Sequence, residues 1–182
     1  MTSHINMPNL SRFVATPRIP AQAAILLLAL LLVSCIGPGQ GLSIASDFQV
    51  TLFDGSSFRL SDEAGQRAVV LNFWFPSCPP CRAEMPAFQQ AWEEAQGEQV
   101  RFLGLFVPQG FDTEQDARDF VEKLDLTYDF ATDVRVQVTR EYQVIYFPTT
   151  VFVDKSGRVF RTEVSILDAE TITGILRQMA QG

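Results

Sequence analysis

The 182-residue sequence is poor in histidine, cysteine and basic residues. Its only histidine is His4, and its three cysteines are Cys35, Cys78 and Cys81. A Cys/His metal site needs about four ligands. Because His4 and Cys35 both lie in the N-terminal segment, we expect no metal site. Lysine and arginine number 14 against 21 acidic residues, without a basic cluster. The chain therefore lacks the positive surface that binds nucleic acid or anionic lipid.

The first 46 residues differ from the rest in charge. They contain no Asp or Glu, carry Arg12 and Arg18, and continue into the apolar run Ala23–Val33. This order is typical of a signal peptide. The run is shorter than the about 20 residues that a spanning helix needs, although an uncleaved membrane anchor is the alternative. The Gly and Pro content of residues 36–46 indicates a flexible linker.

The end of the apolar run, Leu32-Val33-Ser34-Cys35, resembles the lipobox of bacterial lipoproteins. In a lipobox the cysteine is lipidated and becomes the mature N-terminus. We therefore predict a signal peptide over residues 1–35, with Cys35 as the lipidation site. A lipoprotein and an uncleaved anchor both place the domain outside the cytoplasm, anchored to the membrane.

Cys78 and Cys81 bracket Pro79-Pro80 between a predicted strand, Val69–Phe75, and a helix-like segment that opens at Arg82. At such a junction the first sulfur lies over the helix N-terminus, where free N–H groups and the helix dipole favour an anion. The cysteine pKa then falls from about 8.5 to about 3.5–7.5, so the thiolate is present at neutral pH. The pattern predicts that Cys78 attacks a disulfide and that Cys81 resolves the product.

Two other roles for this pair remain open. A structural disulfide is one, although a four-residue loop constrains the unfolded chain little. A thiol peroxidase is the other, although Phe75 stands three residues before Cys78, where a peroxide-reducing cysteine usually has Thr or Ser. Exchange with a protein disulfide is therefore the favoured interpretation.

Residues 47–182 alternate between strand-like and helix-like segments. We expect strands at 48–53, 57–60, 68–75, 100–107, 149–153 and 158–163. We expect helices after Cys81, from a capping box at Thr113–Asp116 to Leu124, over 133–142 with Val134 and Val138 inward, and after an N-cap at Asp168. This order predicts one three-layer α/β/α domain with a mixed central sheet and an added N-terminal β-hairpin.

The stretch LNFWFPSCPPCRAEMP at residues 71–86 resembles the active-site segment of the thioredoxin superfamily. It is most similar to the extracytoplasmic TlpA/ResA-type branch. Phe147-Pro148-Thr149-Thr150 at a strand start, with Gly157 beyond it, supports this similarity, which covers essentially all of residues 47–180. The resemblance implies a thioredoxin fold and a thiol-disulfide oxidoreductase. Its redox group would be the Cys78–Cys81 disulfide, without a cofactor.

The resemblance also implies site roles. Cys78 matches the exposed nucleophile and Cys81 the buried resolving thiol. Pro148 matches a proline after a cis peptide bond, although an ordinary turn proline is the alternative. Glu84 matches an acid that exchanges a proton with the resolving thiol, against the alternative of a solvated helix residue. The residues expected to bind substrate are Trp74, Pro79, Pro80, Phe147, Pro148 and Thr149, although Trp74 also suits the core.

Two positions differ from thioredoxin itself. Asn72 replaces a buried Asp and cannot ionise, so Glu84 or water would have to relay the proton. Ser77 stands where the family usually has Trp before the first cysteine. Without that ring we expect Cys78 to be more open to water, with an altered substrate preference.

TlpA/ResA-type proteins mostly reduce disulfides outside the cytoplasm, including those of apocytochrome c before haem attachment. The resemblance therefore implies disulfide-containing protein substrates and a CcdA/DsbD-type membrane electron donor, and we expect a monomer. The residues leave the direction of electron flow open, because potentials in this fold span about −270 to about −120 mV. A non-catalytic thioredoxin-fold binding or holdase lipoprotein is the alternative from another class.

Overall fold

The computed structural model describes residues 43–96 and 99–181. The predicted signal peptide 1–35, with Cys35, and residues 36–42 of the predicted linker lie outside this part of the chain. None of the helices within the described ranges is long and apolar enough to cross a membrane. The strands and helices, in chain order, are β1 (Gln49–Thr51), β2 (Ser57–Arg59), β3 (Ala68–Trp74), α2 (Pro79–Glu94), β4 (Val100–Phe106), α3 (Glu114–Lys123), β5 (Asp129–Thr132), α4 (Gln137–Glu141), β6 (Thr149–Val153), β7 (Val159–Glu163) and α5 (Ala169–Ala180).

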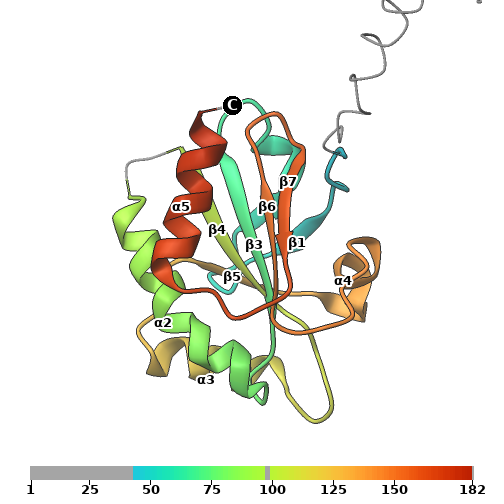
Figure 1. Ribbon diagram of the computed structural model, residues 1–182. Helices are drawn as coiled ribbons and strands as arrows, with labels where there is room; N and C mark the ends of the chain where they lie inside the picture. The colour runs from blue at the N-terminus through green and yellow to red at the C-terminus, as the bar shows by residue number, and fades with distance from the viewer. Residues whose placement is uncertain (1–42, 97–98, 182) are drawn as a thin grey trace, which may run out of the picture. The chain divides into compact units, whose positions relative to one another are not determined.

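Five strands form the central sheet in the order β5-β4-β3-β6-β7 (Figure 1). Strands β3, β4 and β5 are parallel, whereas β6 pairs antiparallel with both β3 and β7. Trp74 pairs with Phe106 and Phe73 pairs with Thr149, so β3 and β4 end where β6 begins. We call this end of the sheet the carboxyl edge. The loops after β3 and β4 and the loop before β6 meet there.

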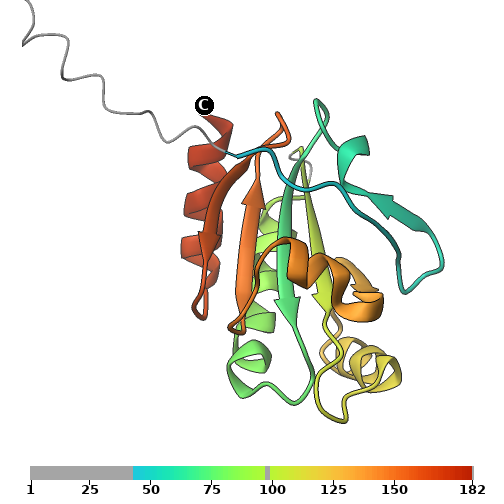
Figure 2. The same ribbon diagram turned by 90° about the vertical axis from the view of Figure 1, so that its right-hand side faces the viewer.

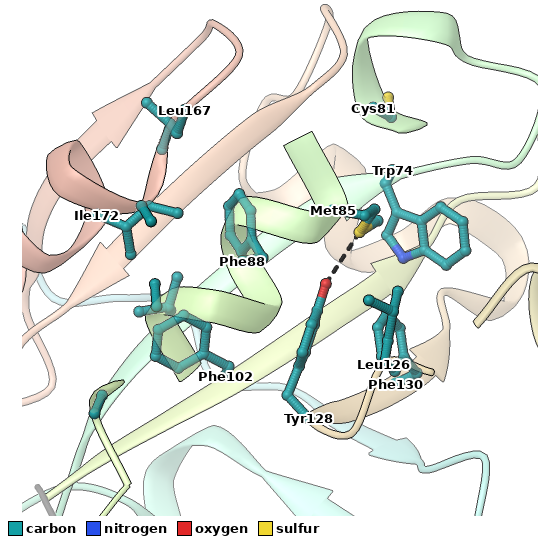
Figure 3. Close-up of a cluster of buried hydrophobic side chains, with 14 of the residues drawn as sticks. Trp74, Cys81, Met85, Phe88, Phe102, Leu126, Tyr128, Phe130, Leu167 and Ile172 are labelled. Carbon is teal, nitrogen blue, oxygen red and sulfur yellow. Dashed lines mark hydrogen bonds between the residues drawn. The ribbon is translucent and has the colours of Figure 1, made fainter. Parts of the chain in front are cut away.

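Both faces of the sheet are covered, which explains why β3 is buried at every residue (Figure 2). Helices α2, α3 and α5 pack on one face, around a cluster that includes Trp74, Phe88, Phe102 and Ile172 (Figure 3). The β1–β2 hairpin and α4 cover the other face, where Phe58 packs among the second cluster. The predicted α/β fold with a mixed central sheet and an N-terminal hairpin is confirmed.

The segment 129–142 differs from the single helix predicted over 133–142. The unpredicted edge strand β5 pairs with β4. The helical part is split because Arg135 and Val136 adopt positive φ angles of 68° and 57°, which an α-helix does not accommodate. Val134, predicted to point inward, is 66% exposed, whereas Val138 is buried as predicted. The helical spacing of the hydrophobic residues did not predict this break in the helix.

The folded domain includes residues 43–46, which the sequence assigned to the linker. The amide of Ala45 donates to the carbonyl of Gly157 at 2.9 Å, and the amide of Val159 donates to the carbonyl of Ser43 at 2.8 Å. These backbone bonds pair the predicted end of the linker with the start of β7. Residues 43–46 are therefore part of the folded unit, because their polar backbone groups are satisfied by it.

Candidate active site

Cys78 and Cys81 form a disulfide, with the sulfurs 2.09 Å apart, at the N-terminus of α2. Cys78 is the N-cap residue, and its sulfur accepts a hydrogen bond from the amide of Cys81 at 3.2 Å. Pro79 and Pro80 occupy the first helical positions, where a missing N–H group leaves no helical bond unmade. The helix therefore begins at Pro79 and not at Arg82 as predicted. A helix N-terminus is a position that favours an anion.

Cys78 is more buried than the sequence led us to expect. Only 3% of its surface is exposed, and Cys81 is fully buried. The rings of Phe75 and Phe147 meet edge to face, with centroids 5.2 Å apart, and pack against the cluster that contains both cysteines. The loss of a ring at Ser77 therefore does not open Cys78 to water. Ser77 itself, directly before Cys78, is exposed.

Glu84 is 1% exposed and lies one helical turn after Cys81. Its Oε1 accepts from Asn72 Nδ2 at 2.8 Å, and its Oε2 accepts from the amide of Leu167 at 3.3 Å. Asn72 also donates to Thr150 at 3.1 Å. Burial raises the pKa of Glu84 to about 7, although both hydrogen bonds act to lower it. The alternative of a solvated helix residue is wrong, and such an acid can exchange protons near neutral pH.

The Phe147–Pro148 peptide bond is cis, as predicted, and β6 begins directly after it. Pro148 is buried and Phe147 is half-buried. Thr149 is only 3% exposed, and its hydroxyl donates to the carbonyl of Tyr146 at 2.7 Å. The Thr149 side chain therefore presents no surface to a substrate and instead holds the preceding turn.

Trp74, also predicted to bind substrate, is fully buried. The rings of Phe106, Phe120 and Phe130 surround it, with centroids 5.6 to 6.2 Å from its own. Figure 3 shows its indole within the core beside Met85. Trp74 therefore belongs to the core and not to a substrate surface, and it supports the end of β3 from which the disulfide loop departs.

Four exposed apolar side chains at the carboxyl edge were not predicted from the sequence. They are Ile145, Tyr146, Val164 and Ile166, which are 54% to 75% exposed, and we call them the apolar rim. Since Thr150 pairs with Glu163, the segment before β6 and the segment after β7 lie at the same end of the sheet. A gathering of this kind is typical of a protein-binding surface. Nothing in the sequence connects the two pairs, because they lie in separate loops.

The site combines a reducible disulfide, a buried acid and an exposed apolar surface. Within residues 43–96 and 99–181, no three His, Cys, Asp or Glu side chains are grouped so that they could hold a metal ion. Of the predicted site residues, Cys78, Cys81, Glu84, Phe147 and Pro148 come together at the carboxyl edge. Pro79 is exposed and Pro80 half-buried beside the disulfide, so both remain candidates for substrate contact.

Comparison with known structures supports the fold. The exposed lipoprotein thioredoxin of Streptococcus pneumoniae strain TIGR4 has a TM-score of 0.65 at 28% identity, with 75% of this chain and 100% of that chain covered. StoA from Bacillus subtilis has a TM-score of 0.64 at 22% identity, with 76% and 98% covered. Both likenesses agree with the thioredoxin fold predicted from the sequence.

Comparison of sequences defines the family. The sequence model of the AhpC/TSA family matches residues 43–161. The thiol-disulfide oxidoreductase ResA of Geobacillus kaustophilus (strain HTA426) is 33% identical over 130 residues, which are 71% of this chain and 72% of that protein. A ResA of Bacillus cereus is 30% identical over 135 residues, which are 74% and 76%. Because the family model covers more than half of the chain, including the cysteine pair, and the ResA relatives match over two thirds of it, the chain belongs to the AhpC/TSA family and is a thiol-disulfide oxidoreductase of the ResA type.

Proposed function

We propose that this protein is a membrane-tethered protein-disulfide reductase that acts outside the cytoplasm. The position of the Cys78–Cys81 pair at the helix N-terminus, beside the apolar rim, supports this most directly. In the proposed reaction the Cys78 thiolate attacks a substrate disulfide, forms a mixed disulfide and releases one substrate thiolate. Cys81 then attacks Cys78, closes the disulfide and releases the second thiolate, so two electrons pass to the substrate.

Glu84 supports the reducing direction and the proposed proton exchange. A buried carboxylate one turn from Cys81 disfavours a second negative charge nearby. The reduced pair then gains less from ionisation than it would beside a neutral group, which favours a reducing potential. Ionised Glu84 can accept the proton of Cys81 when Cys81 attacks Cys78. Neutral Glu84 can return a proton when the electron donor reduces the disulfide and Cys81 leaves as a thiolate. A pKa of about 7 suits both directions.

The proposed substrates are extended polypeptide segments that contain a disulfide, including that of apocytochrome c. In this proposal they lie over Pro79, Pro80 and Phe147 and pair with the backbone near Phe147. A CcdA/DsbD-type membrane protein would return electrons to the pair, and the protein would act as a monomer. The names of the ResA relatives support thiol-disulfide exchange. The substrates and the electron donor named here go beyond those names and are part of this proposal.

Trapping tests the proposal directly. A full-length Cys81→Ala protein, produced in bacterial cells, should accumulate mixed disulfides on Cys78, because no second sulfur can release the substrate. Mass spectrometry of the captured proteins identifies the substrates. The Cys78→Ser, Cys81→Ala double variant is the matched control, and equal capture by both variants would rule out the exchange mechanism. Alkylation of wild-type cells should find the pair reduced, whereas a mainly oxidised pair would contradict the reducing direction.

The proposed tether is a lipid on Cys35. The lipobox-like sequence supports it, and so does the likeness to the pneumococcal protein, which is itself described as an exposed lipoprotein. Radiolabelled palmitate should enter the wild-type chain and the Cys81→Ala chain, whereas Cys35→Ser should lose the label completely. Equal labelling of Cys35→Ser would contradict lipidation at this residue.

A further inference from the structure

The loop between β4 and α3 is attached to the residue that precedes the disulfide. The amide and the hydroxyl of Ser77 both donate to Asp112 Oδ2, at 3.0 and 2.7 Å. The amide of Asp112 donates to the carbonyl of Gln109 at 3.0 Å. The next residue, Thr113, forms a reciprocal capping box with the first turn of α3. The backbone on both sides of Phe111 is therefore held in place.

Phe111, at the tip of this loop, is 103% exposed, the highest value among the large apolar side chains that the structure describes. Within that part of the chain its ring belongs to neither hydrophobic cluster. A fully exposed phenylalanine ring contributes no buried apolar area to the stability of the fold, although it offers a large apolar area to a partner. The attachment to Ser77 therefore holds the loop that carries an exposed apolar ring close to the disulfide.

Strand order places this contact opposite the apolar rim. Because β3 lies between β4 and β6, the loop after β4 and the segment before β6 flank the disulfide loop on opposite sides. Figure 2 shows the β3–α2 and β4–α3 loops side by side at the lower end of the sheet. A polypeptide that crosses the disulfide thus passes between Phe111 on one side and Ile145 and Tyr146 on the other.

We propose that Phe111 determines substrate preference, by contacting an apolar side chain next to the reacting cysteine of the substrate. This inference rests on the proposed function, since it assumes a polypeptide disulfide as substrate. Ser77 contributes by holding the loop through Asp112. The small polar residue before Cys78 therefore supports the contact between Phe111 and the substrate. The preferred substrates are segments in which apolar residues flank the cysteine.

Two synthetic disulfide peptides of equal charge test this, one with Leu and one with Ser beside each cysteine. The full chain in non-ionic detergent, with dithiothreitol as reductant, should reduce the Leu peptide with a kcat/KM about tenfold higher. Phe111→Ser should lower this ratio to about twofold or less, mainly through a higher KM for the Leu peptide, while Phe111→Leu keeps most of it. The matched control is Ile44→Ser, because Ile44 is 75% exposed and pairs with Arg158, at the end of β7 away from the disulfide.

The outcomes separate the two proposals. An unchanged ratio in Phe111→Ser, or an equal loss for both peptides, would overturn the role of Phe111 while leaving the reductase intact. Equal kcat/KM values of the wild type for both peptides would overturn it as well. If the wild type reduces neither peptide, the proposed function itself fails, and the inference fails with it.

Discussion

Replacing Cys78 with serine should reduce insulin reduction by dithiothreitol to the uncatalysed rate, a loss of about 1000-fold or more. The reason is chemical, since a serine hydroxyl stays protonated at neutral pH and cannot form a mixed disulfide. Because Cys78 caps α2 through its side chain, the serine oxygen can accept the same amide hydrogen bond. The fold should therefore survive the change, and circular dichroism checks this.

The matched control for this prediction is Cys35→Ser, which removes the third cysteine of the chain. Its rate should equal that of the wild type, because Cys35 is not part of the disulfide. A Cys78→Ser protein that kept substantial activity would mean that another group carries the reaction. The Cys78–Cys81 pair would then be a structural disulfide, as the sequence alone allowed.

Glu84 should make the free energy of unfolding fall as the pH rises. Folding raises the pKa of Glu84 from 4.5 to about 7, so the folded protein holds this proton more tightly than the unfolded chain. The stabilisation is fully present below pH 4.5 and is lost as the pH rises to about 7. At about 1.4 kcal/mol per pKa unit, the loss amounts to about 3 kcal/mol.

Glu84→Gln isolates this contribution, because glutamine stays neutral. Its single side-chain oxygen replaces two acceptors, which adds a difference that does not depend on pH. Urea unfolding of the oxidised proteins should therefore show the stability of the wild type falling by about 2 to 3 kcal/mol relative to Glu84→Gln between pH 5 and pH 8. Other titrating groups cancel in this comparison.

The control for the pH experiment is Glu94→Gln on the same helix, where the glutamate is exposed. Its stability relative to the wild type should stay nearly constant over this range. A constant difference for Glu84→Gln as well would mean that burial does not raise the pKa of Glu84. The proton exchange with Cys81 at neutral pH would then lose its physical basis.

Features that depend on neighbours in the sequence could be predicted. The capping box at Thr113, the N-cap at Asp168 and the N-terminal hairpin arise from short patterns, and all three are present. Gly55 has a φ of 88°, which glycine adopts without strain. The cysteine pair could also be predicted, because its spacing and its place after a buried strand depend only on neighbouring residues in the sequence.

Features that depend on distant residues could not be predicted. The amide of Leu167 reaches Glu84 across 83 positions, and Ser77 reaches Asp112 across 35. Strand β5 is short and begins and ends with the polar residues Asp129 and Thr132, so no hydrophobic run marks it. Phe147 packs against the cluster that contains Cys78, and only the fold brings the two segments together. In each case tertiary contacts decide the outcome.

The hydrogen bond from Leu167 to Glu84 connects the segment that carries part of the apolar rim to the buried acid. Leu167 follows Ile166 directly, so the same connection that carries half of the apolar rim also holds the acid. An ionised acceptor binds this amide more strongly than a neutral one. Under the proposed function, a substrate that holds this segment in the hydrogen-bonded geometry would favour ionised Glu84, and by reciprocity ionisation of Glu84 would strengthen substrate binding. Substrate binding and proton release from Glu84 would then be thermodynamically coupled.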